Sequence, residues 1–146
     1  MSNFLSFIVK DTTMYSDNLL NIVYDDNDIV FICTCGVELC CHCDYMVTCL
    51  SKIINNTDTI NENKYTLIGF QGSDYLELEI KDFIYNYIHY IRIVYHNNKF
   101  NVYCSCKNKK CKTMEYAILR ILLMYNEKKE KQAINTTEKI FNDLTL

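Results

Sequence analysis

Apolar and polar residues alternate in several short runs along the chain, and turn-forming residues separate the runs. Alternation with aromatic and β-branched residues is typical of half-buried β-strands. It predicts strands at residues 4–9, 19–24, 29–34, 64–70, 75–80, 85–95 and 100–105. The tetrads at 25–28 and 96–99 are rich in Asp and Asn, so we expect each to join its flanking strands as a β-hairpin. Residues 71–74 predict another hairpin, between strands 64–70 and 75–80.

The apolar period lengthens to between three and four residues after each hairpin, as it does in helices. Apolar residues from 45 to 53 predict a helix that ends near residue 55, and those from 116 to 123 predict one that reaches about residue 125. The charged residues 127–131 are either a solvated stretch or a continuation of that helix. Asn135, with Glu138 three residues later, predicts the N-cap and capping-box partner of a final helix that ends near Leu144.

The two halves of the chain repeat each other at a constant offset of 71 residues. Ile22-Val23-Tyr24 corresponds to Ile93-Val94-Tyr95, and Val9-Lys10-Asp11 corresponds to Ile80-Lys81-Asp82. A single offset kept over so many positions indicates a tandem duplication. We therefore predict an α+β protein of two β-hairpin-plus-helix units, residues 1–71 and 72–146, packed as one compact body.

Cysteines mark the junction of hairpin and helix in both units. The first unit has Cys33, Cys35, Cys40 and His42 in the order C-x-C-x4-C-x-H. Alternate residues of a strand face the same side, so the C-x-C pair presents both sulfurs together, and Cys40 and His42 follow at the helix entry. Four such ligands can enclose one structural Zn²⁺ and leave no position for a catalytic water.

Three other cysteines lie near these ligands. Cys41 and Cys43 flank His42, and each is either an alternative metal ligand or an ordinary thiol. Cys49 on the helix is expected to be a small buried apolar residue. In the second unit Cys104, Cys106 and Cys111 keep the spacing of the first three ligands, but Thr113 replaces the histidine.

This arrangement resembles the SWIM zinc-finger family over residues 19–55, and in degenerate form over residues 90–125. The resemblance implies zinc on Cys33, Cys35, Cys40 and His42. It also implies a module that binds DNA or protein and is not an enzyme. Thr113 departs from the family pattern, which puts a metal in the second unit in doubt.

The hairpin register offers the second unit another histidine. If the chain turns symmetrically about Asn97-Asn98, the residue numbers of paired positions sum to 195, and His89 then faces Cys106 on the ligand side. We therefore expect one Zn²⁺ in the first unit, and His89 is the candidate ligand that would complete a second site with Cys104, Cys106 and Cys111. A slip of one residue in the register would turn His89 away from this site. The counterpart of His89 in the first unit is Asn18.

Composition limits where the protein acts. The chain has 146 residues, 9 Cys and no Pro. No run is apolar enough to span a membrane, and residues 1–10 lack the pattern of a secretory signal. We expect an intracellular protein in a reducing compartment, the cytoplasm or nucleus, where closely spaced cysteines more often bind metal than form disulfides. Abundant Asn, Ile, Lys and Tyr is typical of AT-rich coding DNA and hints at a large DNA virus, in which case the compartment is that of an infected host cell.

The sequence favours binding over catalysis, because it contains no common catalytic or nucleotide-binding motif. The net charge of −3 is unevenly divided, with an acidic first unit and a basic second unit. Four residues of the second metal loop, Lys107, Lys109, Lys110 and Lys112, are candidates for nucleic-acid contact or a solubilising patch. Four tyrosines, Tyr85, Tyr87, Tyr90 and Tyr95, are candidates for base stacking or for sheet packing. The alternatives to a nucleic-acid partner are a protein–protein adaptor and a homodimer.

Overall fold

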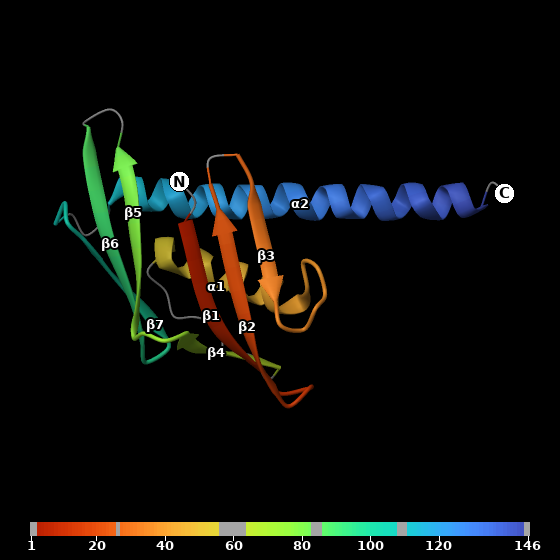
Figure 1. Cartoon of the computed structure of the whole chain (residues 1–146), viewed down its shortest axis with the longest axis horizontal. Coiled ribbons are helices and arrows are strands. Elements are labelled where there is room, and N and C mark those ends of the chain that lie inside the picture. Colours follow the sequence, from red (N-terminus) through yellow and green to blue (C-terminus); the bar gives the residue numbers. More distant parts are fainter. Residues whose placement is uncertain (1–2, 26, 56–63, 83–85, 108–110, 145–146) are drawn as a thin grey trace.

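Two antiparallel sheets and two helices pack around one hydrophobic core (Figure 1). The computed structural model describes residues 3–25, 27–55, 64–82, 86–107 and 111–144. The first sheet has the strand order β3-β2-β1-β4 and the second has the order β5-β6-β7. The α+β fold class expected from the sequence is confirmed.

The first sheet comes from the first half of the chain, and a helix lies between its third and fourth strands in the sequence. Its elements are β1 (Asn3–Asp11), β2 (Ser16–Tyr24), β3 (Ile29–Cys33), α1 (Cys41–Asn55) and β4 (Tyr65–Phe70). Buried and exposed residues alternate along β2 and β3, so one face of each strand joins the core. The helix α1 covers that face through residues such as Met46 and Leu50, which are buried.

The second sheet has the same order of three strands followed by a helix, but no fourth strand follows among the described residues. Its elements are β5 (Tyr75–Asp82), β6 (Tyr87–His96), β7 (Lys99–Cys104) and α2 (Lys112–Leu144). The turn between β6 and β7 has positive φ angles of 51° and 64° at Asn97 and Asn98, the geometry that two-residue hairpin turns require. That turn sets the ladder from His96–Lys99 to Ile91–Cys104, in which every pair sums to 195.

The expected hairpin between residues 64–70 and 75–80 is wrong. β4 pairs with β1, from Phe7–Phe70 to Asp11–Tyr65, whereas β5 pairs with β6. Only an isolated bridge, between Phe70 and Ser73, links the two segments. The physical reason is burial, because the β1 edge lets Leu67 and Phe70 of β4 enter the core.

The expected separate helix beginning at Asn135 is also wrong, because α2 runs unbroken for 33 residues. No Gly or Pro interrupts residues 112–144. The hydroxyls of Thr136 and Thr137 donate to the carbonyls of Gln132 and Ala133 at 2.9 Å, so they bond to the helix instead of capping a new one. The part of α2 up to Tyr125 packs on the core, and Lys128 and Lys129 still form ion pairs with Asp28 and Asp44 of the first unit. The C-terminal end of α2 extends away from the sheets (Figure 1). Within the described residues no helix has the length and apolarity that crossing a bilayer requires.

Candidate metal centres

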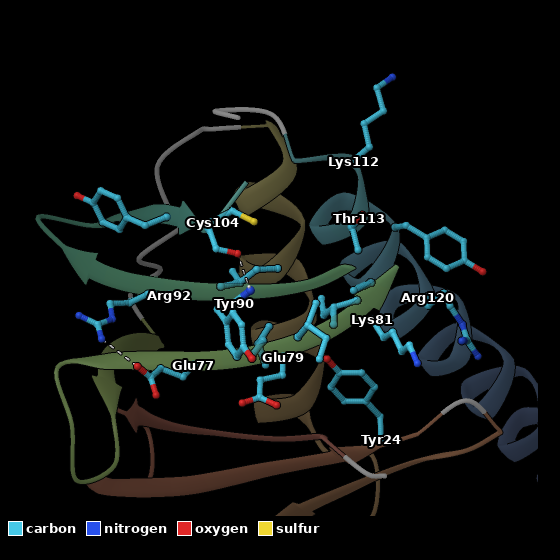
Figure 2. Close-up of a pocket in the computed structure, with 18 of the residues that line it drawn as sticks. Tyr24, Glu77, Glu79, Lys81, Tyr90, Arg92, Cys104, Lys112, Thr113 and Arg120 are labelled. Atoms are coloured by element: carbon cyan, nitrogen blue, oxygen red, sulfur yellow. Dashed lines mark hydrogen bonds and ion pairs between the residues drawn. The ribbon is translucent and has the colours of Figure 1, made fainter. Parts of the chain in front are cut away.

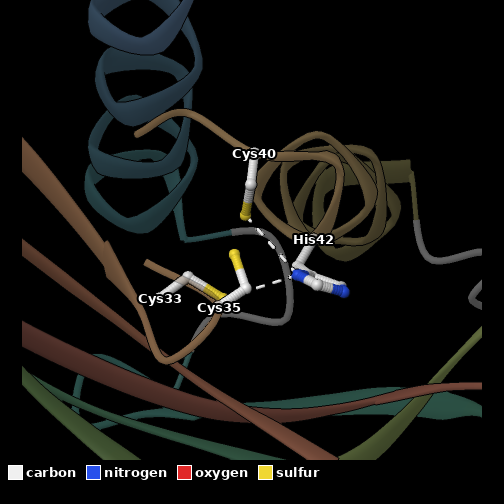
Figure 3. A group of neighbouring side chains, drawn as sticks. All are labelled: Cys33, Cys35, Cys40 and His42. Carbon is white, nitrogen blue, oxygen red and sulfur yellow. Dashed lines mark hydrogen bonds between the residues drawn. The ribbon is translucent and has the colours of Figure 1, made fainter. Parts of the chain in front are cut away.

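The first cluster forms where β3 ends and α1 begins. Cys33, Cys35, Cys40 and His42 each point one ligand atom toward the others, and all four atoms lie within 4.8 Å of one another (Figure 3). The chain can turn back between the two pairs because Gly36 has φ of 78° and its N–H donates to the Cys33 carbonyl at 3.0 Å. The strand end and the helix entry therefore meet as the sequence spacing predicts.

The distances within this cluster fit a bound zinc ion. Two ligands bound at about 2.0–2.3 Å in a tetrahedron lie about 3.5–3.8 Å apart. His42 Nδ1 is 3.5 Å from Cys33 Sγ and 3.6 Å from Cys40 Sγ. All nine cysteines are free thiols, so no disulfide competes for these sulfurs.

A buried carboxylate holds the histidine ring from behind. His42 Nε2 lies 2.8 Å from Asp11 Oδ2, and both side chains are almost fully buried. Hydrogen bonds from the Thr13 hydroxyl and from His42 lower the pKa of Asp11 to about 2, so the carboxylate stays charged. Because Nε2–H then donates to Asp11, Nδ1 keeps the lone pair that a metal needs, as in the carboxylate–histidine–zinc triads of many metal sites.

The thiols of this cluster differ in their ease of ionisation. Burial raises the pKa of Cys33 to about 12. Burial also opposes ionisation of Cys35, but hydrogen bonds, the largest from the Val37 backbone N–H, outweigh it and lower its pKa to about 7. A cation that binds here must therefore displace a proton from Cys33, which makes metal binding depend on pH.

The neighbouring cysteines take other positions. Cys41 is exposed, and Cys49 is fully buried, as expected of an apolar core residue. Cys43 is also buried, with its sulfur 3.6 Å from that of Cys40, but it does not belong to the group of four.

The second cluster contains His89, Cys104, Cys106 and Cys111, whose ligand atoms also lie within 4.8 Å of one another. His89 Nδ1 is 3.4 Å from Cys104 Sγ and 3.6 Å from Cys111 Sγ, again about the edge of a zinc tetrahedron. The symmetric register about Asn97-Asn98 places His89 on the ligand side, as the sequence predicted. At the position of Gly36 this unit has Lys107, which adopts φ of 60° and donates its N–H to the Cys104 carbonyl.

The two clusters exchange the roles of strand and helix. In the first, the helix supplies His42 while Asn18 on the strand lies 3.4 Å from His42 Nε2. In the second, the strand supplies His89 while Thr113 on the helix lies 3.3 Å from His89 Nε2. Asn18 and His89 correspond at the offset of 71, as do His42 and Thr113. Each unit therefore has one imidazole and one polar neighbour, on opposite elements.

The chain carries two Cys3His clusters that fit zinc. Both Cys3His clusters have the ligand types and spacing of structural zinc sites. No known protein family, curated protein or solved structure matches the chain. The likeness to SWIM zinc fingers therefore rests on the motif and its strand–turn–helix setting alone.

Only some of the lysines and tyrosines proposed for nucleic-acid contact lie on one surface. Lys107 and Lys112 are exposed on either side of the second cluster, whereas Lys109, Lys110 and Tyr85 lie outside the described residues. Tyr90 is exposed on the outer face of the second sheet, but Tyr95 packs against Phe100. Tyr103, which the sequence reasoning missed, shares that outer face, because its neighbour in the ladder is Arg92.

Proposed function

We propose that the protein acts by binding another macromolecule and that its two zinc ions are structural. The observation that carries this proposal is the ligand count, because each cluster supplies four protein ligands. A tetrahedral zinc with four protein ligands has no open position for water or substrate. Zinc at such sites contributes roughly 10–16 kcal/mol of apparent binding free energy to folding, which suits two small sheets with a shared core.

The second unit carries the features that fit a nucleic acid. Tyr90 and Tyr103 are 55% and 62% exposed on neighbouring strands. Arg92 pairs directly with Tyr103 and lies two residues from Tyr90 on β6, so all three share one face of the sheet. Stacking of a base on such a ring contributes about 1–3 kcal/mol. Lys107 and Lys112 supply charge for phosphates beside the same sheet. Glu77 accepts a hydrogen bond from Arg92 at 2.9 Å, so part of this positive charge is already neutralised.

A salt titration tests this proposal. The zinc-loaded protein is titrated with a fluorescent single-stranded oligonucleotide at 50, 100 and about 200 mM salt, with the salt dependence analysed as counterion release. We expect binding that weakens steeply with salt, and that weakens several-fold further in Tyr90→Ala and Tyr103→Ala. Tyr15→Ala is the control, because Tyr15 is also an exposed tyrosine, at 94%, but lies in the first unit. No binding at low salt, or equal effects of all three substitutions, would refute the proposal.

A protein–protein adaptor is the second candidate function. The observation that favours it is the outer edge of β5, which no strand of the described residues pairs with, whereas β4 pairs with the corresponding edge of β1.

A further inference from the structure

The first sheet is completed by a strand that returns after the helix. β4 pairs antiparallel with Phe7–Asp11 of β1. It also covers the side of α1 that faces it, since the Leu67 N–H donates to the Tyr45 hydroxyl at 3.2 Å and the Tyr65 ring lies 5.7 Å from that of Tyr45. As a result Tyr45 is only 5% exposed.

The second sheet lacks this strand. The counterparts of Phe7–Asp11 are residues 78–82 of β5, and among the described residues no strand pairs with the outer edge of β5. The counterparts of β4 are residues 136–141, which are part of α2. Tyr116, the counterpart of Tyr45, is consequently 63% exposed.

A cleft lies where the missing strand would be (Figure 2). Its volume is about 1800 Å³, larger than the roughly 300–1,000 Å³ of typical small-molecule sites. Part of its lining corresponds to positions that β4 pairs with or covers in the first unit: Leu78, Glu79, Ile80, Lys81 and Tyr116. Phe4 and Tyr24 of the first sheet line another part, as do Tyr90, Arg92 and Tyr103 on the outer face of the second sheet. The cleft thus offers a strand edge above partly apolar side chains.

We propose that β5 binds an extended segment of a protein partner as a fourth, antiparallel strand. In such strand addition the main-chain hydrogen bonds give affinity and the side-chain pockets give specificity. The β4–β1 pair in the same molecule shows what the segment must provide. It needs large apolar residues at the places of Leu67 and Phe70, which are buried in the first unit. These two pair with Val9 and Phe7, so their equivalents would lie beside Ile80 and Leu78. This inference deepens the adaptor candidate and is separate from the nucleic-acid proposal, although Tyr90, Arg92 and Tyr103 border the same cleft.

The protein's own tail fits this edge poorly. At the offset of 71, Glu138 would take the place of Leu67, which is only 2% exposed. Burying a carboxylate without a partner is strongly unfavourable. A strand from another protein that has an apolar residue at that position avoids this cost. Residues 136–141 of this chain, or of a second copy, do not.

Amide chemical shifts of the isotope-labelled, zinc-loaded protein test the proposal. The probe is a synthetic peptide with the β4 sequence, residues 64–71 (KYTLIGFQ). The control is the same peptide with glutamate in place of Leu67, which puts a carboxylate where the site requires an apolar side chain. We expect saturable shifts at Leu78, Glu79, Ile80 and Lys81 with the first peptide and none with the control. Shifts confined to β1, or none at all, would overturn the proposal.

Two variants and a mass measurement complete the test. Tyr116→Ala is expected to weaken peptide binding about fivefold, the effect of losing one aromatic contact of about 1 kcal/mol. Leu123→Ala is the matched control, because Leu123 is similarly exposed on α2 but does not line the cleft. Both residues are on the surface, so both variants should fold. Equal loss in the two variants would overturn the proposal, as would light scattering that shows a dimer paired through β5, since a second copy would then occupy the edge.

Discussion

The exchange of roles between His89 and Thr113 predicts that the fourth zinc ligand can be moved from one element to the other. His89→Ala removes the imidazole whose Nδ1 lies 3.4 and 3.6 Å from two cysteine sulfurs. Four ligands share about 10–16 kcal/mol of apparent binding free energy, or roughly 3–4 kcal/mol each. At 1.4 kcal/mol per decade, we expect the second site to lose zinc affinity by about a hundredfold or more.

The double variant His89→Asn/Thr113→His should restore that affinity, because it recreates the Asn18 and His42 arrangement of the first unit. The assay is competition with a chromogenic zinc chelator, which resolves the tight and weakened sites on one chain. Thr113→His alone is the control for added histidine. Retention of two tight zincs in His89→Ala would refute the reasoning, and so would a double variant that binds no better than His89→Ala.

Three further predictions follow from the surroundings of the two clusters. Asp11→Asn should weaken zinc at the first site about 10–100-fold and leave the second unchanged, because the charged partner of His42 is lost; equal effects at both sites in the chelator assay would contradict this. Burial raises the pKa of Cys33 and of Cys104 to about 12, so both are protonated at neutral pH and zinc must displace their protons. Each site's affinity should therefore rise at least about tenfold per pH unit from 6 to 8, and a flat response would be inconsistent with it. Lys107→Gly should raise the free energy of unfolding by about 1 kcal/mol, because it relieves the positive φ of 60°; a lower urea midpoint would disprove that effect.

Local sequence patterns correctly predicted those features that depend only on residues close together in the chain. The alternation around Ile91 and Ile93 places these side chains in the core. The turn at Asn97-Asn98 fixes the register, and the register places His89 among the cysteines. The spacing of Cys33, Cys35, Cys40 and His42 likewise determines that strand end and helix start converge.

Features that depend on distant contacts could not be predicted in this way. The turn after Phe70 resembles a hairpin locally, but the strand pairs with β1 because its apolar residues are buried there. Asn135 has the residue type of a helix cap, yet nothing before it ends α2. Asp11 lies 31 positions from His42, so no local signal connects them.

The zinc content of the native protein tests the central claim most directly. Protein purified without added metal or chelator is measured by elemental mass spectrometry, and its intact mass is measured under denaturing, non-reducing conditions. We predict two zinc ions per chain and nine reduced cysteines, with both clusters occupied. A metal-free chain that keeps its secondary structure, or a mass lowered by disulfide formation among the ligand cysteines, would contradict the account.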